Sequence, residues 1–192
     1  LLALVSHIEG LAKQVSTEWN SYRAAFVASS GTDAGSSLTA LFNAFNMHHE
    51  LLKNFKLGLP LGLRAGQNQT EPTRVEAYYS GMSTALARLH FTTTTDIYRG
   101  MSRNGTAGPS FRDYARSAIG GEDLVNQTED QIRKVEAAFA SLPDAPLPQQ
   151  IVEQRSEPIA VHTELQKLTR FYKSELTSRL GLSITYSSND GD

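Results

Sequence analysis

Apolar residues recur at steps of three or four along most of this chain, and that spacing is the strongest constraint on its fold. Residues 2–29 carry one such stripe, and residues 34–56 carry a second. The period matches one face of an α-helix, so both segments are predicted to form amphipathic helices. The first stripe consists of Leu4, Ile8, Leu11, Val15, Trp19, Tyr22 and Phe26, and the second of Leu38, Leu41, Phe42, Phe45, Leu52 and Phe55.

Breaker residues set the expected ends of the helices. Gly58 and Pro60 are predicted to end the second helix, with a loop over residues 58–70 packed on the bundle. A third helix is expected to open at residues 70–72, where Pro72 suits a first turn, and to run to about residue 98. The later elements are a loop with a short helix near residues 111–118, long helices over about 122–141 and 150–180, and a short extended segment over 182–186.

These elements predict an all-α fold, an antiparallel up-and-down bundle of four to five long helices with a short extended C-terminal tail. A chain of 192 residues suits a single domain. It begins without Met and in what reads as the middle of a helix, so we expect a processed or truncated N-terminus. Pro158 is expected to lie in an early turn of the last helix or to break it.

Composition excludes several classes of function. The formal charge is −2, with no basic field that would neutralise phosphates, so no nucleic-acid partner is expected. The absence of cysteine excludes disulfides, thiolate nucleophiles and Cys-ligated metal sites. No apolar run approaches the length needed to span a bilayer, so no membrane span is expected in this chain.

A cluster of histidines is the part of the sequence that most resembles a metal-binding motif. His48, His49 and Glu50 resemble part of a zinc-peptidase helix, but the position that should hold the second ligand is Lys53. Adjacent imidazoles on a helix point about 100° apart, so one metal could not easily take both. We interpret these histidines as surface or groove residues and predict no catalytic residue, no metal site and no cofactor in this chain.

A polar face on the third predicted helix is the candidate binding surface. Glu76, Ser80 and Ser83 stand at i, i+4 and i+7, and Lys56 lies upstream beside the Gly/Pro segment. We expect these four residues to line a ligand site or a domain interface. Glu76 would accept hydrogen bonds, Lys56 would supply positive charge, and the serines would allow close approach.

Several short stretches resemble the imelysin family, whose members are also described as peptidase M75-like proteins. Residues 55–62 read Phe-Lys-Leu-Gly-Leu-Pro-Leu-Gly and resemble the family's Lys-x-Gly-x-Pro-Leu-Gly loop. Residues 76–83 resemble its Glu-x-x-x-Ser-x-x-Ser/Thr helix, and residues 98–100 its Tyr-x-Gly. The tail, Leu-Gly-Leu at 180–182 and Asp-Gly-Asp at 190–192, resembles the family's ending.

The resemblance implies two packed helical bundles, an extracytoplasmic bacterial location in the periplasm or at the outer membrane, often a lipid anchor, and a link to iron uptake. The family's hallmark, Gly-x-His-x-x-Glu, is absent, since no His-x-x-Glu occurs anywhere in the chain. The chain would then correspond to the C-terminal half. The Arg often found in the family's Glu/Ser helix is replaced by Tyr78 and Tyr79.

We therefore expect a binding domain that lines a cleft shared with an N-terminal imelysin-like bundle of the same protein. Its ligand would be a small molecule, a metal or a peptide, and iron or zinc would belong to the full-length protein. Two alternatives stay open. One is a part of an imelysin-type metallopeptidase, and the other is a non-catalytic surface scaffold or adhesion module.

Overall fold

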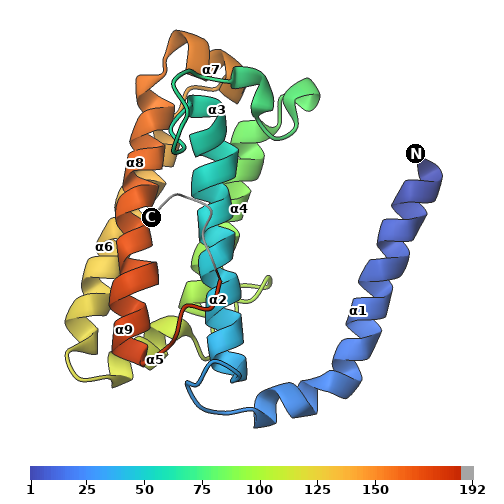
Figure 1. Cartoon of the computed structure of the whole chain (residues 1–192), viewed down its shortest axis with the longest axis vertical. Helices are drawn as coiled ribbons and strands as arrows, with labels where there is room; N and C mark the ends of the chain where they lie inside the picture. Colours follow the sequence, from blue (N-terminus) through green and yellow to red (C-terminus); the bar gives the residue numbers. More distant parts are fainter. Residues whose placement is uncertain (187–192) are drawn as a thin grey trace.

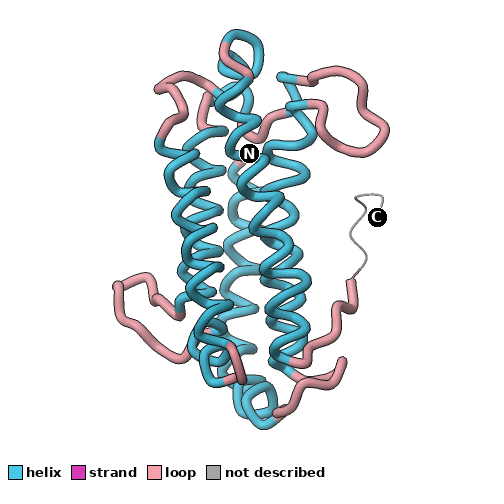
Figure 2. The backbone as a smooth tube through the Cα atoms, turned by 90° about the vertical axis from the view of Figure 1, so that its left-hand side faces the viewer, coloured by secondary structure: helices cyan, strands magenta, loops and turns pink. Residues whose placement is uncertain are grey.

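The computed structural model describes residues 1–186, and it confirms the predicted all-α class. Four helical rods run up and down side by side to form the bundle (Figures 1 and 2). The rods are α2 (Ser37–Glu50) with η1 (Leu51–Gly58) and α3 (Leu59–Leu61), then α4 (Ser83–Arg99), α6 (Gly121–Ala140), and α8 (Ser156–Arg170) with η4 (Phe171–Leu176) and α9 (Thr177–Leu180). Shorter elements join them: η2 (Pro72–Arg74), η3 (Tyr78–Ser80), α5 (Phe111–Ser117) and α7 (Leu147–Glu153).

The first helix, α1 (Leu2–Ala28), stands apart from this bundle. Its length agrees with the predicted helix over residues 2–29. None of its residues is buried, and Figure 1 shows it projecting away from the other rods before the chain turns into α2. Its apolar stripe therefore contributes nothing to the core of the bundle.

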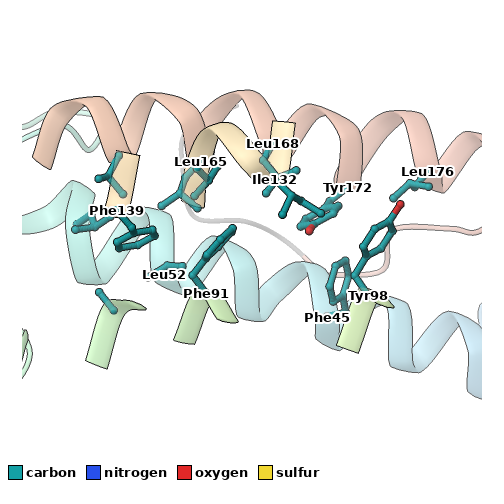
Figure 3. Packing of buried hydrophobic residues seen from close by; sticks show 14 of the residues in the cluster. Phe45, Leu52, Phe91, Tyr98, Ile132, Phe139, Leu165, Leu168, Tyr172 and Leu176 are labelled. Atoms are coloured by element: carbon teal, nitrogen blue, oxygen red, sulfur yellow. The ribbon is translucent and has the colours of Figure 1, made fainter. Parts of the chain in front are cut away.

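Aromatic and branched aliphatic side chains from all four rods fill the core (Figure 3). Phe91 of α4 stacks on Phe139 of α6, with ring centroids 5.5 Å apart. Phe45 of α2 meets Tyr172 of η4 edge to face at 4.7 Å. Such aromatic pairs stabilise a core beyond their buried area, by about 0.5–1.5 kcal/mol each. Of the second predicted stripe, Phe42, Phe45 and Leu52 lie in the core, whereas Leu41 and Phe55 are exposed. The first predicted stripe, on α1, lies outside the core.

The expected break at Gly58 and Pro60 is wrong. The second helix continues through both residues as η1, a π-helix, and as α3, and it ends only at Gly62, which has φ 70°. The wider i→i+5 turns of a π-helix leave room for a proline ring that would meet the carbonyl of residue i−4 in an α-helix. Leu57 and Leu61, 1% and 0% exposed, anchor this extension in the core. The predicted loop over residues 58–70 therefore begins only at Gly62.

The third helix starts later than predicted. Residues 70–82 form the turns η2 and η3, and α4 begins at Ser83. Ala77 and Gly81 both adopt positive φ, 56° and 68°, which is incompatible with an α-helix. The helix-compatible composition of this segment does not overcome two left-handed residues.

The last predicted helix is divided in two. The α-helical backbone stops after α7 and resumes at α8, with Pro158 in the first turn of α8 as expected. The tail from Leu182 to Tyr186 forms no strand, but it docks on α2 through Asn43 and Glu50. The Asn43 side chain donates to the carbonyl of Ser183 and accepts from the Thr185 amide, both at 2.8 Å. The Asp-Gly-Asp ending lies outside the described residues.

The hydropathy of the helices agrees with the prediction that this chain contains no membrane span. Within residues 1–186, no helix combines the length and apolar character that a membrane span requires.

Candidate functional site

An ion pair joins the π-helical part of the second rod to the segment that precedes α4. Lys56 Nζ lies 2.6 Å from Glu76 Oε2, and the two side chains are 23% and 43% exposed. At that exposure the pair contributes at most about 1 kcal/mol of stability. Its main consequence is geometric, because it brings together two of the predicted site residues that are 20 positions apart in sequence.

The two predicted serines differ in burial and in hydrogen-bond partner. Ser83 is 2% exposed, and its Oγ donates a hydrogen bond to the Glu76 carbonyl. Ser80 is exposed, and its Oγ donates to the carbonyl of Ala77 at 3.1 Å. The predicted helical face of Glu76, Ser80 and Ser83 is therefore wrong, since only Ser83 is in a helix of more than one turn. Ser83 fixes the backbone beside Glu76 and is not available to a ligand.

Backbone strain lies within this segment. Ala77 is the one non-glycine residue with positive φ in the described part of the chain. A left-handed conformation costs a non-glycine residue about 1–2 kcal/mol, and such strain concentrates at functional sites. The Ser83 hydroxyl and the Lys56 ion pair both hold the adjacent Glu76 in this strained turn.

Two stacked histidines lie on the neighbouring helices. The His48 ring of α2 and the His90 ring of α4 are 3.7 Å apart with an interplanar angle of 30°. His90 Nε2 lies 2.8 Å from the His48 carbonyl, which can only accept, so Nε2 carries the proton. Thr94 Oγ1 donates its only proton to the His90 carbonyl at 2.8 Å, and it lies 3.0 Å from His48 Nδ1. Because Thr94 can therefore only accept from His48, Nδ1 of His48 carries the proton.

The surroundings of both imidazoles lower their pKa and so favour the neutral form. Burial, with a smaller contribution from His48, lowers the pKa of His90 to about 4. Burial and the nearby charge of Lys56 also lower the pKa of His48. Each ring therefore keeps one nitrogen lone pair, on His48 Nε2 and His90 Nδ1, that its hydrogen bond above does not use.

Sequence reasoning missed half of this cluster. His48 is half-buried, which agrees with the predicted groove position. The same prediction is wrong for His49, which is 1% exposed, and the sequence did not single out His90 and Thr94. The only sequence signal is the i, i+4 spacing of His90 and Thr94 on one helix face. The pairing of His48 with His90 depends on how α2 packs on α4, which no local pattern encodes.

A metal site does not fit these residues. His49 points away from His48 into the core, where its Nε2 lies 3.0 Å from Thr169 Oγ1 and 3.2 Å from the Leu165 carbonyl. Glu76, the nearby carboxylate, is already paired with Lys56. Over residues 1–186 no group of three or more candidate ligands converges on one point.

The remaining resemblance motifs have structural roles. Gly58 is packed so closely that an added Cβ would lie 3.0 Å from the Lys53 carbonyl and 3.2 Å from His162 Nε2. Tyr98 is fully buried, and Arg99 binds Glu129 of α6 at 2.6 Å. These residues hold the rods together.

Comparison with known proteins agrees with this architecture. The family model described as Imelysin matches residues 2–172. A crystal structure of an imelysin peptidase from Bacteroides ovatus superimposes with a TM-score of 0.64 at 22% identity. The match covers 82% of this chain but 44% of that one, so the chain spans less than half the length of this relative. A search of the curated proteins gives no match.

We predict that His49 makes folding less favourable in acid. Burial, together with the charge of Lys53, lowers its pKa to about 3, whereas an unfolded chain has the ordinary value of about 6.5. The unfolded state thus binds one more proton between these values, so stability is full above about pH 6.5 and falls as pH decreases towards 3. The slope from this group is about 1.4 kcal/mol per pH unit near pH 5.

Urea unfolding at pH 7.5, 6 and 5 measures this slope. His49→Gln should reduce the pH dependence by about one proton, whereas His7→Gln, on the exposed α1, should leave it unchanged. Equal slopes for the wild type and His49→Gln would contradict the prediction.

Proposed function

This chain belongs to the imelysin family, and we propose that it is a binding domain whose polar cluster lines a cleft shared with a second helical bundle. The cluster consists of Lys56, Glu76, His48 and His90. The second bundle is an N-terminal imelysin-like bundle of the same protein. The observation that carries this proposal is the exposed apolar face of α1.

An isolated amphipathic helix of this kind is not stable in water by itself, because most helical stability in proteins comes from packing of the apolar face. Leu4, Leu11 and Val15 are 59%, 50% and 69% exposed. Burial of a large aliphatic side chain contributes about 1.5–3 kcal/mol. A stripe of four aliphatic and three aromatic residues therefore favours burial against a partner.

Aromatic residues strengthen this face at its C-terminal end. The Trp19 ring lies 5.3 Å from that of Phe26 and 6.1 Å from that of Tyr22. Clustered aromatic residues are typical of the centre of protein interfaces. The extra length of the Bacteroides relative supports a second bundle as the occupant of this face.

The bundle beside the polar cluster also exposes apolar side chains. Leu51 and Phe55 of η1 are 41% and 42% exposed, and Leu89 of α4 is 61% exposed. Ligand sites commonly combine an apolar lining with a few fixed polar groups. In this proposal Lys56 supplies positive charge, Glu76 accepts hydrogen bonds, and the free nitrogens of His48 and His90 accept from ligand donors. Exposed Ser80 allows close approach at the rim.

The proposal includes an extracytoplasmic location, a lipid anchor and a link to iron uptake, and family membership is its support. The ligand is a small molecule, a metal or a peptide, and any iron or zinc would require ligands from beyond the described residues. Immunodetection in fractionated cells grown with and without iron tests this part. We expect the protein in the periplasmic or outer-membrane fraction and at higher level under iron starvation; a cytosolic, iron-independent signal would contradict it.

The chain's single tryptophan reports on the proposed docking. Trp19 is 43% exposed here, so acrylamide should quench its fluorescence efficiently in this chain. In the full-length protein we expect a blue-shifted emission and several-fold weaker quenching, because the second bundle would cover α1. The difference between the wild type and Trp19→Phe isolates this signal from other tryptophans.

Charge introduced on α1 provides the matched control. Ile8→Asp with Leu11→Asp should leave the unfolding free energy of this chain within about 0.5 kcal/mol, since both residues are exposed. The same pair should restore exposed Trp19 emission in the full-length protein. Lys56→Ala and Glu76→Ala should each weaken docking of the second bundle or binding of a ligand to the polar cluster. Undiminished quenching of Trp19 in the full-length protein would contradict docking on α1.

A further inference from the structure

A small polar pocket lies between η1 and α8, and neither Lys56 nor Glu76 lines it. Its volume is about 140 Å³. Pockets for whole drug-sized ligands are larger, about 300–1,000 Å³, so this one suits a single charged group. Its polar lining comes from Lys53, Asn54, Arg64, His162, Gln166, Thr169 and Lys173.

One face of the last rod supplies four of these side chains. His162, Gln166, Thr169 and Lys173 stand at steps of four, three and four, which places them on one side of α8 and η4. This polar stripe faces the second rod, where apolar residues would be expected in a simple bundle. Such a stripe in a packed interface indicates a site that needs polar groups.

Three cations converge on the pocket. Lys53 is 3% exposed, although burial of an ammonium group is costly unless anions or hydrogen-bond acceptors surround it. Arg64 lies with its guanidinium 4.3 Å from the centre of the Phe55 ring, which fixes its direction. Lys173 Nζ lies 3.1 Å from Glu50 Oε1, and Glu50 also accepts from the Tyr186 hydroxyl at 3.2 Å.

The other lining groups are hydrogen-bonding and neutral. Burial and the charge of Lys53 lower the pKa of His162 to about 4, so its ring is uncharged at neutral pH. Thr169 Oγ1 donates to the Leu165 carbonyl at 3.0 Å, and Gln166 carries an amide that can donate. Cations at close range, with the Gln166 amide beside them, form the chemistry that binds a carboxylate through charge-assisted hydrogen bonds.

We propose that this pocket is a carboxylate-binding site in which Lys53, Arg64 and Lys173 hold one carboxylate group. The inference does not depend on the proposed docking of a second bundle. Each of the three cations already takes part in an interaction, so an added carboxylate binds by exchange. Two sources share this chemistry: a free carboxylate ligand, and the chain's own aspartates at positions 190 and 192, outside the described residues.

Acetate is the probe for the test, with inorganic phosphate as the comparison anion. Binding to the full chain is measured by NMR, from the His162 ring signals and the Lys53 amide signal. We expect saturable shifts with acetate at millimolar concentration, and the comparison with phosphate shows how far binding depends on the charge of the anion. Arg64→Gln and Lys53→Met should each weaken acetate binding about tenfold or more, or about 1.4 kcal/mol.

Lys167→Gln is the matched control. This lysine is on the same helix, is 56% exposed and binds Glu164, but it does not line the pocket. Its substitution should leave acetate affinity unchanged. Since Arg64 is outside the core, Arg64→Gln keeps the test valid even if Lys53→Met unfolds the protein.

Asp190→Asn with Asp192→Asn distinguishes the two sources. A gain of about tenfold or more in acetate affinity in this double variant would assign the site to the chain's own aspartates, and an unchanged affinity would assign it to a free carboxylate ligand. The absence of a saturable shift in both the wild type and the double variant would overturn the proposal. An acetate affinity unaffected by Arg64→Gln would overturn it as well.

Discussion

Burial of charged and polar groups along one rod is the constraint around which the rest of the bundle is arranged. His49, Glu50 and Lys53 are 1%, 5% and 3% exposed, and they lie within five consecutive residues of the rod. Buried polar groups must be hydrogen-bonded, so α8 brings Thr169 and the Leu165 carbonyl to the neutral His49 ring. Buried charges must be paired, and η4 brings Lys173 to Glu50. The same rod presents Lys56 towards Glu76 and the histidine pair. Both candidate sites therefore depend on the geometry of one segment, the π-helix η1.

Much of the fold is readable from the sequence because apolar periodicity is a local signal. It predicts the rods α2, α4 in its later part, α6 and α8, as well as the short α5. It fails where packing overrides local preference. Gly58 and Pro60 are breakers by composition, yet Leu57 and Leu61 bury their side chains and keep the rod helical. Conversely, the composition of residues 70–82 favours a helix, but the left-handed Ala77 and Gly81 prevent one.

The candidate sites were harder to predict than the fold, for a physical reason. Lys56 and Glu76 do meet, but their contact comes from a turn and not from the expected helical face. His48 and His90 stack across 42 positions, and no spacing rule connects residues on different rods. The stripe of His162, Gln166, Thr169 and Lys173 has a readable period, yet its polar character alone would place it in solvent. The apolar stripe of α1 was read correctly as a helix, although its exposure follows only from the structure.

Backbone NMR across residues 51–61 tests the continuity of the rod most directly, because both sites require it. Carbon-13 Cα shifts and amide exchange report helical structure residue by residue. If the rod is continuous, helical shifts should persist through Gly58 to Leu61, with protected amides at Leu57 and Gly58, and should end at Gly62. Coil-like shifts and rapid exchange over 58–61 would contradict it, and would separate Lys53 and Lys56 from the scaffold that positions them.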